Sequence, residues 1–114
     1  MVKPTITMKD LDKIDIRVGK IVKVFDITAS DKLVGLVVDF GEFQRTILVG
    51  MKKERENPQA EIEGKQALFV VNLAPKLMFG IESHGMLFDI GYTNKITPVL
   101  AIPEKEVPNG TIAG

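Results

Sequence analysis

A long alternation of apolar and polar residues near the start of the chain limits the fold more than any other feature. From residue 14 to residue 24, apolar side chains recur at every second position, as they do on one face of a strand. The apolar face holds Ile14, Ile16, Val18, Val22 and Val24, and the opposite face holds Lys13, Asp15, Arg17 and Lys23. The pattern predicts a long strand with one buried face. Gly19 would let this strand bend, and Lys20, which interrupts the apolar face, indicates a β-bulge nearby.

Four more strands are predicted after this one. Stretches rich in Val, Leu, Ile and Phe mark them at residues 33–40, 45–50, 65–72 and 86–90. Residues 97–102 give a short sixth segment, and Val107–Gly110 is turn-like. The turn Phe40-Gly41-Glu42-Phe43 lies between the second and third strands, so these two strands should form a hairpin.

Capping residues predict two short helices. Thr7, followed three positions later by Asp10, has the spacing of a capping box, which predicts a helix at residues 7–12. Asn57 suits an N-cap, Pro58 the first helical position and Gly64 the end of a helix. The second helix is therefore expected at about residues 58–63, between the third and fourth strands.

The order of these elements predicts an all-β fold. A five-stranded Greek-key barrel with a short helix between strands three and four is the OB-fold, here preceded by a short N-terminal helix. With 114 residues and no linker or repeat, the chain should form a single domain over residues 1–114. In this fold the loops between strands one and two and between strands four and five flank the ligand face. Those loops correspond to residues 26–32 and 75–83.

Composition excludes several classes of function. Cysteine is absent, which excludes disulfides, zinc–thiolate sites and thiol catalysis, and one histidine gives no set of metal ligands. No metal ion or cofactor is therefore expected. A net charge of zero, from 15 basic and 15 acidic residues, disfavours a large non-specific DNA-binding protein. The sequence has no signal peptide and no apolar run near the ~20 residues that span a bilayer, so we expect a cytoplasmic protein with no membrane partner.

Short motifs in a fixed order give the chain a family likeness. They are DIRVGKI (15–21), SDKL (30–33), DFG (39–41), RTILVG (45–50), GK (64–65), NLAP (72–75), GIES (80–83), GML (85–87) and VPNG (107–110). Each is weak alone, but together they cover nearly the whole chain. With them the chain resembles the OB-fold tRNA-binding domain family. That family includes stand-alone structure-specific tRNA-binding proteins, the domain appended to many methionyl-tRNA synthetases, and a branch described as secretion chaperones.

The resemblance implies a non-catalytic module that binds the outside of folded tRNA by shape and phosphate backbone. It also implies a homodimer whose seam lies outside the barrel, and an aminoacyl-tRNA synthetase as a partner. By position, the loop after NLAP, the GIES segment and the outer basic residues would contact RNA. The chain departs from the family in three places. Lys76 is the only basic residue between Pro75 and Gly80, His84 replaces a Glu or Gln, and residues 26–29 lack a His-Pro-Asn lead-in.

The residues predicted to contact RNA combine suitable chemistry with a place on the ligand face. Affinity for RNA comes largely from Lys and Arg side chains that neutralise phosphates. Hydroxyl groups can bind ribose or phosphate, and an aromatic ring can stack on an unpaired base. The predicted set is Arg17, Lys23, Lys76, Phe79 and Ser83. Further basic candidates are Lys13, Arg45, Lys52, Lys53 and Arg55.

Two features of residues 72–86 admit other interpretations. Glu82, Ser83 and His84 together suggest a hydrolase, but neighbours in a tight turn rarely face one another, so no catalytic residue is predicted. Leu77, Met78 and Phe79 are apolar and adjacent, and the first expectation is a loop that buries two of them over one end of the barrel. The alternatives are an exposed interface and base stacking. An exposed cluster would suit a dimeric chaperone that binds unfolded peptide or preprotein.

Overall fold

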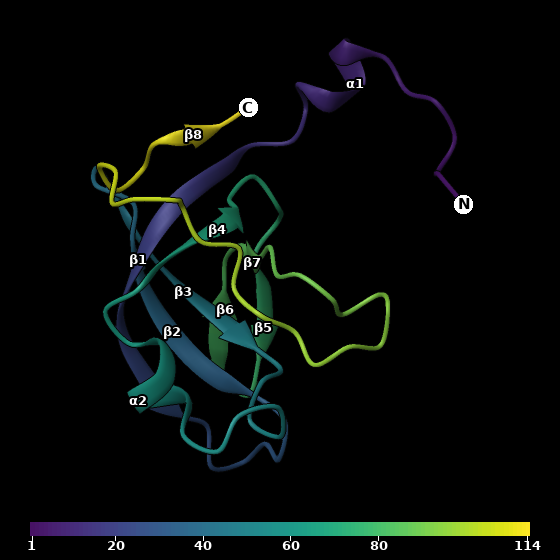
Figure 1. Ribbon diagram of the computed structural model, residues 1–114. Coiled ribbons are helices and arrows are strands. Elements are labelled where there is room, and N and C mark those ends of the chain that lie inside the picture. The colour runs from purple at the N-terminus through teal and green to yellow at the C-terminus, as the bar shows by residue number, and fades with distance from the viewer.

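One long strand, β1 (Ile16–Asp26), organises the barrel (Figure 1). In this computed structural model, which describes residues 1–114, β1 pairs antiparallel with β2 (Val34–Asp39) through residues 20–26. The earlier part of β1 pairs with β4 (Gln66–Val70) through residues 16–20. β1 is therefore paired with a different strand along each half of its length, and its curvature lets the sheet close into a barrel.

A bulge in β1 occurs close to the predicted position. Ile21 pairs with Val38 and Lys23 with Val37, which leaves Val22 as the extra residue. Val22 is 39% exposed, so the prediction that it shares the buried face with Val24 is wrong. The bulge instead brings Ile21 into the core, where it is fully buried.

The other barrel strands follow the predicted order. β2 forms a hairpin with β3 (Gln44–Val49), and α2 (Pro58–Ile62), capped by Asn57, precedes β4. The sheet order is β3-β2-β1-β4-β7, with β7 at Met86–Leu87. The barrel closes between β7 and β3, where the backbone N–H of His84 donates to the carbonyl of Thr46 in β3 at 2.9 Å. The structure therefore confirms an OB-type five-stranded barrel with a helix between strands three and four.

Aliphatic and phenylalanine side chains fill the barrel. Phe40 and Phe69 meet edge to face with ring centroids 5.6 Å apart, and both are almost fully buried. The fully buried aliphatic residues Ile21, Leu36, Val38, Ile47 and Ile62 pack in the same cluster. Gly19 belongs to this packing, because a Cβ there would collide with Val38 and Phe40.

Two terminal elements lie outside the barrel. α1 (Met8–Leu11) has the predicted capping box, stands off the barrel and buries none of its residues (Figure 1). β8 (Ile112–Ala113) pairs with the start of β1. Residues 97–102, predicted as a short sixth segment, form one isolated bridge, between Val99 and Ile90. Neither helix has the length and hydrophobicity that crossing a bilayer requires.

The segment predicted as a loop at residues 75–83 is a two-stranded hairpin. β5 (Lys76–Met78) pairs antiparallel with β6 (Ile81–Ser83), and Leu77 lies opposite Glu82. The turn between them places Phe79 and Gly80 at positive φ, 51° and 74°. Two consecutive residues in this conformation form the tight turn that suits the twist of a hairpin.

Candidate nucleic-acid interface

A polar cleft lies where β1 begins, β3 begins and β4 ends. Its volume is about 470 Å³. We call it the arginine cleft, and its lining residues are Asp15, Arg17, Phe43, Arg45, Val71, Asn72, Leu73, Ala74 and His84. Residues 72–74 lead directly into the β5–β6 hairpin, so the cleft and the hairpin adjoin each other.

Arg17 is held in the arginine cleft by Asp15, which lies just before β1. Its Nε donates to Oδ1 of Asp15 at 2.9 Å, and its Nη2 donates to Oδ2 at 3.1 Å. This two-point hydrogen bond is the main reason that the pKa of Arg17 rises above its ordinary value. A guanidinium carries five N–H donors, so the donors of Nη1 and one of Nη2 are left for a ligand.

Arg45 forms the opposite wall of the cleft and also helps to close the barrel. Its Nη1 donates to the Val71 carbonyl at 3.1 Å, and its guanidinium lies 4.7 Å from the ring centre of Phe43. These contacts hold the Arg45 guanidinium at the cleft that Arg17 also lines. Sequence reasoning left Arg45 outside the predicted contact set, because β1 and β3 are not neighbours in the sheet and meet here only through closure of the barrel.

Asn72 is a structural residue at this cleft. Its Oδ1 accepts from the Asp15 backbone N–H at 2.9 Å, and its Nδ2 donates to the Lys13 carbonyl at 2.6 Å. These bonds join the entry to β1 with the exit from β4, as expected for an Asn that satisfies backbone groups. They also set the position of Asp15, and through it that of Arg17.

The structure corrects the prediction for Ser83. This residue is only 5% exposed, and its Oγ accepts from the Leu48 backbone N–H at 3.0 Å. The hydroxyl therefore stabilises the contact between β6 and β3 and is not free to bind RNA. Its buried position also removes Ser83 as a nucleophile beside His84.

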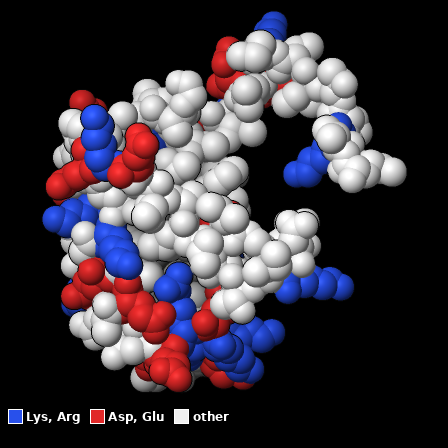
Figure 2. Space-filling view, viewed as in Figure 1, with Lys and Arg blue, Asp and Glu red and all other residues white.

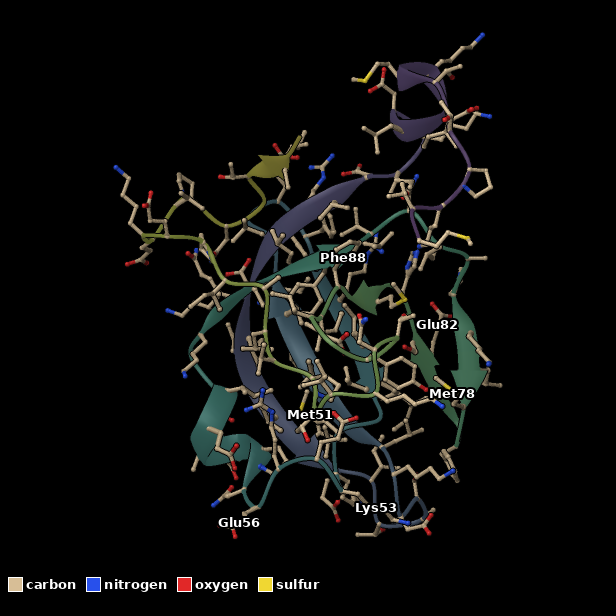
Figure 3. All side chains as sticks on the ribbon, turned by 45° about the vertical axis from the view of Figure 1, so that its right-hand side comes forward. Met51, Lys53, Glu56, Met78, Glu82 and Phe88 are labelled. Carbon is tan, nitrogen blue, oxygen red and sulfur yellow. The ribbon has the colours of Figure 1, made fainter.

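The other predicted contact residues lie at separate places on the surface. Lys76, at the base of the hairpin, and Phe79, at its tip, are both exposed. Lys23 is exposed beyond the bulge in β1 and does not line the arginine cleft. Figure 3 shows Met78 on the hairpin nearer than Glu82 to the end of the barrel where Lys53 lies. The hairpin thus runs from the arginine cleft toward the opposite end of the barrel.

The expectation that two of the three apolar residues at 77–79 are buried is wrong. Leu77 is 73% exposed and Phe79 is 55% exposed, and only Met78 is half-buried. The hairpin turns alternate side chains outward, whereas the predicted loop would have folded them over the barrel. An exposed apolar pair of this kind favours an interaction surface.

Two of the other basic candidates serve the fold. Lys52 donates to the carbonyls of Ile27 and Ser30 at 2.8 and 2.5 Å, so it holds the loop after β1 in place. Arg55 forms an ion pair with Glu61 at 3.2 Å. Figure 2 shows basic and acidic side chains intermixed on this lower part of the molecule, where a broad basic surface is not formed.

Glu54 and Asp89 are half-buried carboxyl groups without a hydrogen-bond or ion-pair partner in the protein. Burial raises the pKa of Asp89 above its ordinary value. Burial also raises the pKa of Glu54, the Asp89 carboxyl raises it further, and Arg55 opposes the rise. The two groups are therefore neighbours whose ionisation opposes folding.

The pair gives a prediction for the pH dependence of stability. Where pH is below the ordinary pKa values, both carboxyls are protonated in the folded and unfolded chains, so they cost nothing. As pH rises, the unfolded chain ionises first, which favours unfolding until the folded carboxyls also lose their protons. We expect E54Q/D89N to exceed the wild type in unfolding free energy by roughly 0.5 kcal/mol near neutral pH, because water still reaches both groups.

Urea unfolding from about pH 3 to about pH 7 measures this effect. The stability curves of variant and wild type should converge at the acid end. Glu56→Gln, which removes an exposed neighbouring carboxylate, is the matched control. A difference between E54Q/D89N and wild type that stays constant with pH would contradict the prediction.

A family model described as "Putative tRNA binding domain" matches residues 16–112. The chain belongs to this family. The tRNA-binding domain is 38% identical over 109 residues to the methionine–tRNA ligase of Archaeoglobus fulgidus, and 42% identical over 110 residues to that of Methanococcoides burtonii. Each match covers 96% of this chain but only 16% of the curated relative.

Two solved structures resemble the whole tRNA-binding domain. A MetRS related protein from Pyrococcus horikoshii superposes with a TM-score of 0.88 at 36% identity, covering 98% of this chain and 100% of that chain. The chaperone CsaA from Bacillus anthracis superposes with a TM-score of 0.82 at 26% identity, covering 97% and 100%. The family likeness predicted from the motifs is confirmed by these matches.

Proposed function

We propose that this tRNA-binding domain is a non-catalytic module that recognises folded tRNA by its shape and phosphate backbone. The observation that carries the proposal is the convergence of Arg17 and Arg45 in one cleft, next to a hairpin that begins with Lys76. Phe79 at the hairpin tip and Lys23 on β1 would extend the contact. The proposed contact set is Arg17, Lys23, Arg45, Lys76 and Phe79.

Arginine chemistry suits this role. A planar guanidinium can donate two parallel hydrogen bonds to one phosphate, and such charge-assisted bonds are stronger than neutral ones. In the arginine cleft both guanidinium groups are already oriented by protein acceptors, so little side-chain entropy would be lost on binding. N–H donors that are fixed in space bind phosphates only at matching positions. Recognition of this kind favours the shape of a folded RNA over its base sequence.

Filter binding of folded tRNA over a salt series tests the proposal. We expect retention near physiological ionic strength and an affinity that falls linearly with the logarithm of salt concentration. The same tRNA kept unfolded, and a duplex DNA of equal length, are the matched controls and should bind more weakly. Absence of salt-dependent retention of folded tRNA would overturn the proposal.

The hydrogen bonds of Ser83 and His84, at the end of the hairpin, support a non-catalytic role. The Ser83 hydroxyl is buried and already hydrogen-bonded to the backbone of β3. The His84 backbone N–H also bonds to β3, where the barrel closes. Catalysis by a serine needs an exposed hydroxyl beside a base. The module would therefore supply binding, with a synthetase partner in the cytoplasm supplying the chemistry.

We further propose that the domain is a homodimer joined through α1. A groove of about 800 Å³ lies between α1, the entry to β1 and the free edge of β8. Its apolar residues Met8, Leu11, Ile14 and Ile112 are 48–71% exposed. A helix of four residues is not stable alone in water, so α1 needs a surface to pack against. A second copy of this chain would offer the same apolar groove in return.

The dimer gives a direct prediction. Met8→Ser combined with Leu11→Ser should weaken self-association at least about tenfold, because each apolar side chain contributes about 1.5–3 kcal/mol when buried. The barrel should keep its stability, since α1 buries nothing within the monomer. Sedimentation equilibrium measures the association, and Val2→Ser, an exposed residue outside the groove, is the control. Equal association constants for the double variant and the wild type would rule out this seam.

A second candidate function is a dimeric chaperone for unfolded peptide or preprotein. The exposed pair Leu77 and Phe79 supports it, because exposed apolar side chains suit varied apolar partners. The structural likeness to the chaperone CsaA points the same way. Changing both residues to Ser should abolish binding of an apolar reporter peptide; if peptide binding is unchanged, this candidate fails.

A further inference from the structure

A second cleft opens at the end of the barrel remote from α1. Its volume is about 440 Å³, within the range of about 300–1,000 Å³ that holds small ligands. We call it the carboxyl cleft, and its lining residues are Lys32, Val49, Gly50, Lys53, Glu54, Asp89 and Tyr92. Figures 1 and 3 place α1 at one end of the molecule and Lys53 at the other, so the cleft is distant from the proposed dimer seam.

The side chains of the carboxyl cleft differ in kind from those of the arginine cleft. Glu54 and Asp89 line the cleft with acceptor oxygens, and neither carboxyl takes part in a hydrogen bond or an ion pair within the protein. Partial burial raises the pKa of both carboxyls above the ordinary value. A ligand with N–H donors would match these acceptor oxygens.

An aromatic ring and two cations complete the cleft. Tyr92 is 71% exposed and presents its ring at the rim, with no aromatic neighbour of its own. Lys32 and Lys53 also line the cleft and are exposed, and Lys53 makes only a loose ion pair of 3.7 Å with the exposed Asp31. A stacking surface, acceptors and phosphate-binding cations are the groups that hold a single unstacked nucleotide.

We propose that the carboxyl cleft binds one unpaired guanine of the RNA, with Tyr92 stacking on the base and the carboxyl pair accepting from its edge. This proposal rests on the proposed function and adds base selectivity to binding that is otherwise shape-based. Lys32 and Lys53 neutralise the phosphates that flank the guanine.

Guanine fits the acceptors better than the other bases do. Its pairing edge carries two adjacent donors, N1–H and the N2 amino group, which match the two oxygens of one carboxylate. Adenine, cytosine and uracil each place an acceptor beside their single donor group, so a carboxylate gains one bond and meets repulsion from the other atom. A metal ion is disfavoured, because only two carboxyl groups are present and two lysines stand at the entrance.

Fluorescence anisotropy with short uridine-rich RNAs that differ only in one central base tests the proposal. The RNA with a central guanine should bind wild-type protein about tenfold more tightly than those with adenine, cytosine or uracil. E54Q/D89N should abolish this preference while binding the all-uridine RNA at least as well, since negative charge is removed. Tyr92→Ala should weaken all four RNAs at least about fivefold, and Tyr92→Phe should restore them.

Glu56→Gln is the matched control, because Glu56 is exposed and lies outside the cleft. Equal affinities for the four RNAs, or a guanine preference that survives E54Q/D89N, would overturn the guanine site. Retention of folded tRNA by the wild type is measured separately. Intact retention with no base preference defeats only the guanine site, whereas loss of retention defeats the proposed function itself.

Discussion

Changing Arg17 and Arg45 together to Gln is expected to lower the affinity for folded tRNA by at least about a hundredfold. Each guanidinium contributes a charge-assisted hydrogen bond worth about 1.5–3 kcal/mol. The loss of Arg17 has an added cost, because it leaves the Asp15 carboxylate unpaired in the arginine cleft, where it would repel phosphate. The slope of log affinity against log salt should fall by about 1.4–1.8, for two lost phosphate contacts.

Filter binding over a salt series measures both quantities. Lys13→Gln is the matched control, because Lys13 lies near the cleft in sequence but does not line it. Urea unfolding of the double variant is also needed, since Arg45 hydrogen-bonds the Val71 carbonyl and contacts Phe43. If Lys13→Gln weakened binding as much as the double variant does, diffuse charge would explain the affinity and the arginine cleft would not.

The barrel followed from sequence because its elements are specified locally. The alternation in β1, the capping residues Thr7 and Asn57 and the turn at Phe40–Phe43 each act over a few residues. The failures arise where the structure depends on contacts between distant parts of the chain. The sequence around Lys20 and Val22 does not specify which residue forms the bulge. The position of the bulge depends on pairing with β2, a strand distant along the chain.

The candidate site was only partly predictable. Arg17 was predicted because it lies on the polar face of β1. Arg45, which lines the same cleft, comes from a strand that reaches β1 only when the barrel closes. Ser83 looked available because no sequence pattern shows that the Leu48 N–H needs an acceptor. The carboxyl cleft joins residues from the loop after β1, the turn after β3 and the segment after β7, so no spacing in the sequence could reveal it.

The β5–β6 hairpin was missed because its turn lacks the usual signal. Tight hairpin turns with two residues at positive φ favour Asn-Gly or Asp-Gly, and this chain has Phe79-Gly80. A phenylalanine in the left-handed region is uncommon and costs about 1–2 kcal/mol. The barrel does not need the ring there, because Phe79 is 55% exposed. A strained and exposed aromatic residue points to a binding role.

Phe79→Asn separates that role from the conformation of the turn. Asparagine tolerates the left-handed conformation, so the turn should persist, and relief of strain should offset the loss of partial burial to within about 1 kcal/mol. If the ring stacks on an unpaired base of tRNA, its removal should lower affinity by about tenfold, since such stacking is worth about 1–3 kcal/mol. Filter binding and urea unfolding of the variant measure the two effects.

Leu77→Thr is the control that distinguishes an aromatic contact from a merely apolar one. Leu77 is more exposed than Phe79 and lies on the same hairpin, and threonine suits a strand. Base stacking predicts that tRNA binding falls with Phe79→Asn and stays with Leu77→Thr. If instead both variants lose an apolar peptide and neither loses tRNA, the hairpin serves the chaperone function, and the RNA contact is confined to the arginine cleft. The hairpin tip is therefore the place where the two candidate functions make opposite predictions.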